Sequence, residues 1–316
     1  MITLAKKIVS FFMTVLFLLR QLPKAMRGRR FLRHADPDVF YIVCPCSIGD
    51  IVVASVAAQY LPTDKRIVIL IRGNYRSLNG KLGAAECLAN SALARNAEWY
   101  ILLFNRYRGK NYIYGHFHHD VSRLRVRRRY ELTAWEDYCR NVYQIPTQSL
   151  HRCHQPIPSG CTHTLTKQDV ILCPYAHSMK PVPQDFWQTL TDRLHACGFT
   201  VYTNVAAKET PVPGTQAFVC GLDAIAAAVS DCAAVVSLRS GICDYLAVYS
   251  EAHLVVLSRP QVILSSEKPD RAENWDVSFL REDGVDNFIF EESRQAELID
   301  GIVAAVQQPK ETNYES

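Results

Sequence analysis

The residues Arg-Ser-Gly-Ile at 239–242 form a short turn whose composition suits an anion. The apolar run before the turn predicts the end of a buried strand, and the run from Asp244 predicts the first turns of a helix. Backbone N–H groups at a helix start, together with the helix dipole, favour a phosphate. Arg239 adds a guanidinium suited to phosphate oxygens. The plainer interpretation is an ordinary corner in which Arg239 pairs with Asp244.

A second corner of this kind lies near the start of the chain, after the apolar run 40–44. Gly49 lets the backbone approach a ligand, and Asp50 offers a carboxylate that can act as a general base. The plainer interpretation of Asp50 is a helix N-cap. Cys44 and Cys46 lie in the same stretch, but two Cys without a second pair make no zinc pattern, so no metal is predicted.

A third loop follows the predicted strand 169–173. We expect His177 and Ser178 in this loop to contact phosphate or sugar, and Lys180 to act as a cationic partner of the diphosphate. Asn204, at the end of the next strand, is a candidate for the base or ribose pocket. The plainer interpretations are a surface lysine for Lys180 and a turn residue for Asn204.

Strands and helices must alternate along the chain to hold these three loops together. Apolar runs at 66–71 and 99–104 predict further strands, and 184–197 predicts an amphipathic helix. Alternating elements of this kind predict an α/β fold with doubly wound parallel sheets. The chain of 316 residues is long enough for two domains. We predict an acceptor-side domain, a linker, a second domain and a disordered tail, at 37–150, 151–168, 169–308 and 309–316.

The composition fits a packed cytoplasmic protein, with 48% hydrophobic residues, 21% charged residues and a net charge of +4. The 11 Cys are scattered and predict no disulfide framework. A run containing Arg123 and Arg125 follows a stretch of aromatics and His, and we interpret it as a pocket edge or as a surface for a phosphorylated or lipid-linked partner; the plainer interpretation is a solvated charged face. Nucleic acid is not predicted, because no recognised binding module accompanies the run.

Residues 1–36 are predicted to associate with a membrane. Residues 8–19 are uncharged and mostly apolar, with Lys and Arg on both sides. A helix of this length covers about 18 Å, less than the roughly 30 Å of a hydrocarbon core. We therefore favour a helix lying in the interface of an anionic membrane over a signal anchor. A helix packed on the protein's own body ranks below both, because the segment is apolar on nearly every face.

Three stretches in this order resemble the GT-B glycosyltransferases of the heptosyltransferase-like group, which build bacterial lipopolysaccharide and capsule. They are the Gly-Asp loop 47–54, the strand and loop 173–180 with Phe-Trp at 186–187, and the turn 236–244. The family usually has Asp-Ser/Thr-Gly at the turn and a His three residues later, whereas this chain has Arg239 and Asp244. The resemblance implies two Rossmann-like domains, a nucleotide-sugar on the second, an acceptor on the first and no obligatory metal.

The resulting hypothesis is sugar transfer from a nucleoside-diphosphate sugar to a glycan or lipid-linked hydroxyl at the inner face of the plasma membrane, without a cofactor. Asp50 is the candidate base. The candidate diphosphate donors are the backbone N–H groups of Ser240, Gly241 and Ile242, and the acceptor-side candidates are Ser47, Gly49, Arg123 and Arg125. The alternatives are a non-catalytic nucleotide-sugar or polysaccharide-binding scaffold and an oxidoreductase. The oxidoreductase fingerprint G-x-G-x-x-G is missing from the first loop.

Overall fold

The chain divides into two compact units, unit 1 over Met1–His116 and unit 2 over Phe117–Ser316. The structure is a computed structural model that describes residues 2–116, 135, 138–146, 165–176, 179–259, 276–277, 280–281 and 283–308. Most of the predicted linker and all of the predicted tail lie outside these residues. The linker, the tail and the domain boundary at 150 therefore stay predictions.

Unit 1 is built on a six-stranded sheet with the order β3-β4-β2-β1-β6-β5. Its inner strands are parallel, and the two edge strands pair antiparallel with their neighbours. The strands are β1 (Val39–Val43), β2 (Arg66–Ile71), β3 (Gly80–Leu82), β4 (Ala85–Ala89), β5 (Arg108–Gly109) and β6 (Tyr112–Tyr114). The predicted strand at 66–71 is confirmed. Its Ile-Val-Ile-Leu-Ile run is buried on both faces, as expected for a parallel sheet.

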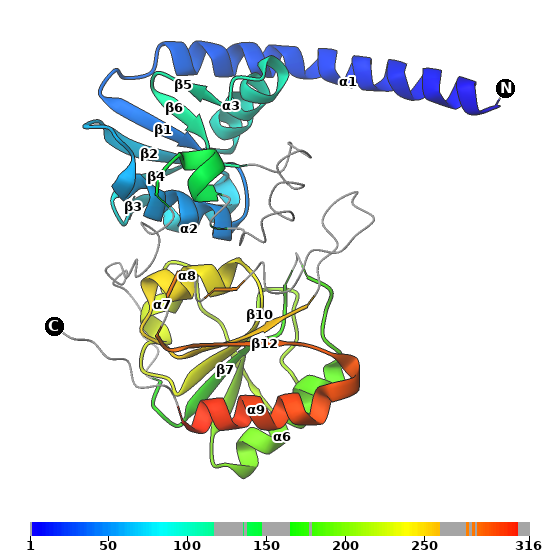
Figure 1. The fold of residues 1–316 in the computed structure, drawn as a ribbon, viewed down its shortest axis with the longest axis vertical. Coiled ribbons are helices and arrows are strands. Elements are labelled where there is room, and N and C mark those ends of the chain that lie inside the picture. The colour runs from blue at the N-terminus through cyan, green and yellow to red at the C-terminus, as the bar shows by residue number, and fades with distance from the viewer. Residues whose placement is uncertain are drawn as a thin grey trace. The chain divides into compact units, whose positions relative to one another are not determined.

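Helices cover both faces of this sheet, with α2 (Ile48–Ala57) on one face and α3 (Ser91–Phe104) with α1 (Ile2–Arg33) on the other (Figure 1). The strand predicted at 99–104 is wrong, because these residues form the last turns of α3. The Asn90 side chain caps α3 by accepting a hydrogen bond from the Leu93 N–H, and Asn105 ends it in a left-handed conformation. Short helical turns lie at η1 (Ala58–Tyr60) and η2 (Gly73–Leu78).

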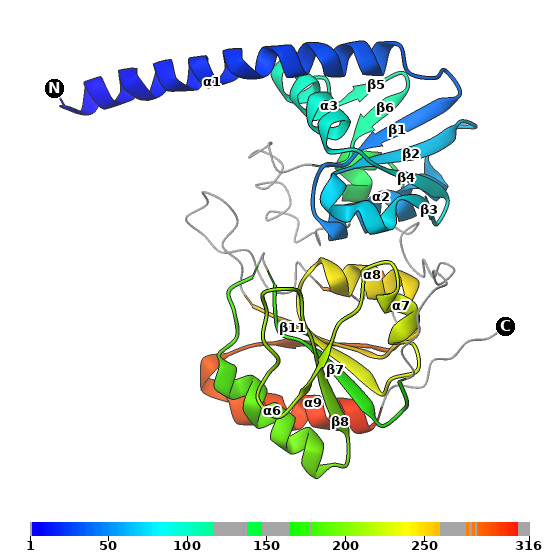
Figure 2. The same ribbon diagram turned by 180° about the vertical axis from the view of Figure 1, so that it is seen from behind.

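The long helix α1 has two different halves. Four residues along one stripe of its second half are buried, and a Cβ at Gly28 would lie 2.0 Å from the Asn96 carbonyl oxygen of α3. The four are Gln21, Ala25, Gly28 and Leu32. Ranking a self-packed helix last was therefore wrong for residues 21–32. The amino-terminal end extends past α3 (Figures 1 and 2). None of the described helices combines the length and apolar character that crossing a membrane requires.

Unit 2 contains a second six-stranded sheet, with the order β12-β11-β10-β7-β8-β9 and parallel pairing throughout. Its strands are β7 (Asp169–Cys173), β8 (Thr200–Asn204), β9 (Gln216–Phe218), β10 (Ala234–Leu238), β11 (Leu254–Ser258) and β12 (Val285–Ile289). The chain builds outward from β7 in one direction to β9, then returns to the other side of β7 and continues to β12. The predicted doubly wound parallel sheet is confirmed.

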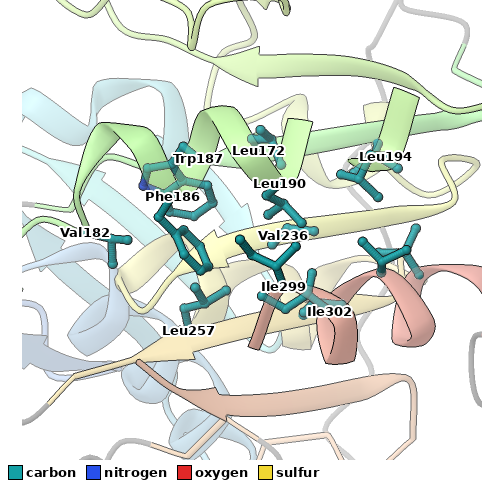
Figure 3. Close-up of a cluster of buried hydrophobic side chains, with 14 of the residues drawn as sticks. Leu172, Val182, Phe186, Trp187, Leu190, Leu194, Val236, Leu257, Ile299 and Ile302 are labelled. Atoms are coloured by element: carbon teal, nitrogen blue, oxygen red, sulfur yellow. The ribbon is translucent and has the colours of Figure 1, made fainter. Parts of the chain in front are cut away.

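The helices α6 (Gln184–Ala196) and α9 (Gln295–Gln307) cover one face of this sheet, and α7 (Ile225–Ala228) and α8 (Gly241–Tyr249) cover the other (Figure 1). Phe186, Leu190 and Leu194 follow one another at helical spacing along α6 and are buried against the strands and α9 (Figure 3). The predicted amphipathic helix is confirmed. Short helical segments lie at η3 (Tyr138–Tyr143) and η6 (Glu292–Arg294).

Candidate functional site

The carboxylate of Asp50 is held in a fixed orientation at the start of α2. Helix α2 begins at Ile48, with Ser47 as its N-cap residue. The Ser47 N–H and hydroxyl both donate to Asp50 Oδ2, at 2.9 and 2.6 Å, and Asp50 is 7% exposed. The interpretation of Asp50 as the N-cap itself is thus corrected: it lies in the first turn of α2, and its carboxylate accepts hydrogen bonds from the cap residue Ser47. This contact orients the carboxylate but leaves its catalytic role a prediction.

Asp50 lies where the sheet of unit 1 reverses its building direction. From β1 the chain adds β2 and β4 on one side, and β6 later pairs on the other side of β1. In open α/β sheets, ligands bind outside the carboxyl ends of the strands at such a switch point. The Gly115 N–H donates to the Val43 carbonyl at 3.0 Å, so the segments that leave β1 and β6 run side by side.

This register brings Cys46 and His116 beside Asp50. The Cys46 thiol sulfur, an Asp50 carboxylate oxygen and a His116 ring nitrogen all lie within 4.8 Å of one another. The Tyr114 ring packs near the His116 ring, with the centroids 6.2 Å apart. The sequence analysis noted Cys46 but did not connect it with His116. Only the pairing of β1 with β6, through Val43 and Tyr114, brings the two together.

Two groups near the Asp50 carboxylate have raised pKa values. Burial raises the pKa of the Cys46 thiol, and a hydrogen bond with Cys44 and the charge of Asp50 raise it further. Burial also raises the pKa of the Tyr75 hydroxyl, again with a contribution from Asp50. Both groups therefore remain protonated at neutral pH.

In unit 2, Arg239 in the turn 239–242 pairs with Asp244, as the plainer interpretation of the sequence predicted. The Arg239 guanidinium donates to both carboxylate oxygens of Asp244, at 2.7 and 3.1 Å, and to the Ser240 carbonyl at 2.6 Å. The two side chains are 4% and 2% exposed. The guanidinium also lies over the Trp135 ring, 5.6 Å from its centroid. Arg239 thus holds the turn to the first part of α8, and direct contact of its side chain with a phosphate stays a prediction.

The backbone of the turn is more accessible than its charged side chains. Ser240 is extended, with φ −155° and ψ 174°, and α8 begins at the next residue. Ser240, Gly241 and Ile242 are half-buried, whereas the following residues of α8 are buried. The turn follows β10, which pairs with β7, and these two strands form the switch point of the second sheet. The predicted strand–turn–helix corner is confirmed, and its position is one at which such folds bind ligands.

The remaining predicted residues lie in different surroundings. Lys180 is exposed in the loop after β7. Asn204 is half-buried at the carboxyl end of β8, and its side chain hydrogen bonds with the thiol of Cys173, whose pKa burial raises. Gly49 is buried in the first turn of α2. Four other predicted site residues lie outside the described part of the chain, so their roles stay predictions. They are Arg123, Arg125, His177 and Ser178.

Arg259 is a cation that the sequence analysis missed. It directly follows β11 and donates to the Pro181 carbonyl at 2.7 Å and to Glu292 at 3.1 Å, with its guanidinium 4.7 Å from the centroid of the Phe290 ring. It therefore fixes the end of the loop that carries Lys180. The available signal was its position, because it is a charged residue close behind the apolar run 254–257.

Two Rossmann-like units, each with candidate ligand-binding loops at the carboxyl ends of its parallel strands, define the GT-B fold of glycosyltransferases. Comparison with solved structures agrees. The E. coli ADP-heptose LPS heptosyltransferase II is 13% identical, with a TM-score of 0.54 over 85% of this chain and 99% of that chain. A family 9 glycosyl transferase from Veillonella parvula is 12% identical, with a TM-score of 0.51 over 87% and 91%. Searches of protein-family profiles and curated sequences gave no match.

Proposed function

We propose that this protein transfers a sugar from a nucleoside-diphosphate sugar to a hydroxyl group of a cell-surface glycan or lipid-linked acceptor. One observation carries the proposal: in the fold of a glycosyltransferase, an oriented carboxylate and a phosphate-compatible helix start occupy the two sheet switch points. Asp50 serves the acceptor, and the turn 239–242 serves the donor.

The reaction exchanges one bond at the anomeric carbon of the donor sugar. The bond from that carbon to the diphosphate oxygen breaks, a bond to the acceptor oxygen forms, and Asp50 takes the hydroxyl proton. Negative charge grows on the departing diphosphate, and preorganised donors directed at growing charge supply a large share of catalysis. The backbone N–H groups of Ser240, Gly241 and Ile242 have this role here, with the exposed Lys180 as a cationic partner.

The buried pair Arg239–Asp244 acts by fixing the donor turn. A phosphate bound at a helix start depends on the orientation of the backbone N–H groups. The hydrogen bonds from Arg239 to the Ser240 carbonyl and to Asp244 tie the donor turn to the first turn of α8. In this proposal Arg239 positions the N–H groups, and its positive charge is balanced by Asp244.

We further propose that α1 binds an anionic membrane surface, so that the protein works at the inner face of the plasma membrane. Several large apolar side chains of α1 are exposed, and basic residues accompany them. The exposed apolar residues are Met13, Leu16, Phe17, Leu18, Leu19, Leu22 and Met26. A shallow pocket at the end of the helix is lined by Arg27, Arg30 and His34, together with one carboxylate, Asp36; the excess of basic side chains suits an anionic headgroup.

A non-catalytic scaffold of the same fold is the second candidate. Its support is that Arg239 and Asp244, the two residues that depart from the family turn, are turned inward onto each other and are almost fully buried. Such a turn can hold a diphosphate through its backbone without offering any side chain to the reaction. Binding without turnover would be the signature of this function.

The experiment is a thermal-shift comparison of nucleoside diphosphates, nucleotide-sugars and plain nucleosides, followed by a transfer assay with the best donor. A ligand at a hundred times its dissociation constant stabilises the protein by about 2.7 kcal/mol. For a domain of this size the shift is about 5–11 °C. Failure of every diphosphate and nucleotide-sugar to shift the melting temperature would rule out the proposal. Stabilisation without hydrolysis or transfer would favour the scaffold.

A further inference from the structure

Cys46, Asp50 and His116 form a cluster of three different metal-ligating side chains in unit 1, hereafter the switch-point cluster. Their ligand atoms all lie within 4.8 Å of one another. The three residues come from two segments that are far apart in sequence and meet only through the parallel pairing of β1 with β6. The fold therefore brings the three side chains together. The proposed sugar transfer uses only one of them, Asp50.

The chemistry of the three donors selects a particular class of ion. Thiolate, imidazole and carboxylate together are the ligands of Zn²⁺, whereas Mg²⁺ and Ca²⁺ are bound by oxygen ligands. Typical zinc–ligand bond lengths in a tetrahedral site place neighbouring ligand atoms about 3.4–3.6 Å apart. Because the three ligand atoms lie no more than 4.8 Å apart, they need to approach one another by at most about 1.2–1.4 Å, a movement within the reach of side-chain rotation.

The surroundings of the cluster also fit a metal site. Ser47 donates two hydrogen bonds to Oδ2 of Asp50, which fixes the carboxylate plane in the way that outer-shell partners orient metal ligands. Cys46 and His116 are half-buried and Asp50 is buried, so the ligands lie near the surface yet largely out of bulk water. Three protein ligands leave the fourth tetrahedral position for water or for an incoming hydroxyl group.

We propose that the switch-point cluster binds one Zn²⁺ ion and that the bound ion inhibits the enzyme. Binding forms a Zn–S bond as the Cys46 thiol releases its proton to solvent, and Asp50 and His116 donate lone pairs to the metal. A carboxylate that ligates Zn²⁺ is a poor proton acceptor, so Asp50 is taken out of acid–base use. This inhibitory consequence rests on the proposed function, whereas the binding of zinc does not.

The test measures zinc binding directly on the full chain after chelator treatment, with a phosphine reductant present. Zn²⁺ is titrated in competition with a chromophoric chelator, and Co²⁺ is titrated separately to detect thiolate coordination by its charge-transfer absorption. Cys46→Ser and His116→Ala remove one ligand each. Cys197→Ser and His195→Ala are the matched controls, because these residues are exposed on or next to α6 in unit 2.

We expect one zinc ion per chain and a cobalt charge-transfer band in the wild type. Each ligand variant should lose at least about tenfold in affinity, because even outer-shell changes cost 10–100-fold. The controls should match the wild type. Absence of stoichiometric binding, a cobalt spectrum without the thiolate band, or ligand variants that bind as tightly as the controls would overturn the site. The cobalt spectrum is read on the wild type and does not depend on the folding of any variant.

Activity separates this inference from the proposed function. In the transfer assay, stoichiometric zinc should inhibit the wild type and the controls, and chelator should restore their activity. Cys46→Ser should resist the same zinc concentration relative to its own metal-free rate. Zinc that binds at the cluster but leaves the rate unchanged, or raises it, would overturn the inhibitory role. A chelated wild type without any transfer activity would instead count against the proposed function, while the binding measurement would still stand.

Discussion

The buried pair Arg239–Asp244 gives the sharpest prediction. Changing Arg239 to Met leaves the Asp244 carboxylate 2% exposed and without its bidentate partner. Removing one member of a buried ion pair costs about 3–5 kcal/mol, because the remaining charge stays desolvated. In a unit of this size that loss lowers the melting temperature by about 6–20 °C. Asp244→Leu should cost a comparable amount, since it leaves the guanidinium in the same position.

The double variant Arg239→Met with Asp244→Leu should recover most of the stability lost by either single change. Replacing a whole buried ion pair by apolar residues of similar volume is often neutral or stabilising. The assay is urea unfolding of all four proteins, from which the coupling energy of the pair is calculated. The same proteins are titrated with a nucleoside diphosphate and with the plain nucleoside.

Two outcomes would refute this reasoning. If Arg239→Met unfolds within about 1 kcal/mol of the wild type, the pair is not the structural element that its burial indicates. If Arg239→Met loses diphosphate affinity by about tenfold to a hundredfold with its nucleoside affinity unchanged, while Asp244→Leu, which breaks the same pair but keeps the guanidinium, loses none, the guanidinium is a direct phosphate ligand. In that case the alternative interpretation of the turn is the correct one.

Three further predictions concern unit 1. Asp50→Asn should lower transfer by about 10²–10⁴-fold with nucleotide affinity unchanged, as measured by steady-state kinetics and calorimetry; equal losses in both would place Asp50 at the donor. Deleting residues 2–19 should weaken binding to anionic vesicles with the fold intact, because it removes five of the seven exposed apolar residues, whereas deleting 2–35 should lower the melting temperature, because it uncovers α3. Gly28→Val should destabilise by about 1–3 kcal/mol in urea unfolding, since its Cβ would lie 2.0 Å from the Asn96 carbonyl oxygen; an unchanged midpoint would show that α1 is not seated on α3.

The second sheet was predictable because its local signals agree with its tertiary structure. Four strands of unit 2, namely β7, β8, β10 and β11, are short runs with β-branched residues that end in a loop, and the helix α6 carries buried residues at helical spacing, whereas β9 (Gln-Ala-Phe) has no such signal. The strand wrongly predicted at 99–104 shows where a local apolar pattern misleads. A continuous apolar run of six residues fits a buried strand or a helix equally well. The deciding features were the Asn90 cap and the left-handed Asn105, fifteen residues apart.

The candidate sites likewise include some that the local sequence reveals and one that only the tertiary structure reveals. The turn 239–242 and the Asp50 loop are contiguous in sequence, so residue types and their order revealed both. The approach of His116 to Cys46 was not predictable, because it depends on which side of β1 the strand β6 joins the sheet. Pairing with β2 or β4 instead would have placed His116 elsewhere with no change in the local sequence. Half of α1 was misjudged for a related reason, since an apolar helix does not reveal which surface will cover it.

The pairing of Arg239 with Asp244 also changes how the donor site must bind a diphosphate. With the two charges cancelling, the turn offers the ligand a helix start worth about 0.3–1 kcal/mol for an anion at an exposed site, and up to about 2 kcal/mol when partly buried. Hydrogen bonds from the half-buried backbone to the charged phosphate add roughly 1.5–3 kcal/mol each. Directional backbone contacts, more than net charge, then set the affinity. Because salt screens exposed charges more than short buried contacts, nucleotide affinity should fall only slightly between low and physiological ionic strength. A steep salt dependence would instead assign the main role to the exposed Lys180.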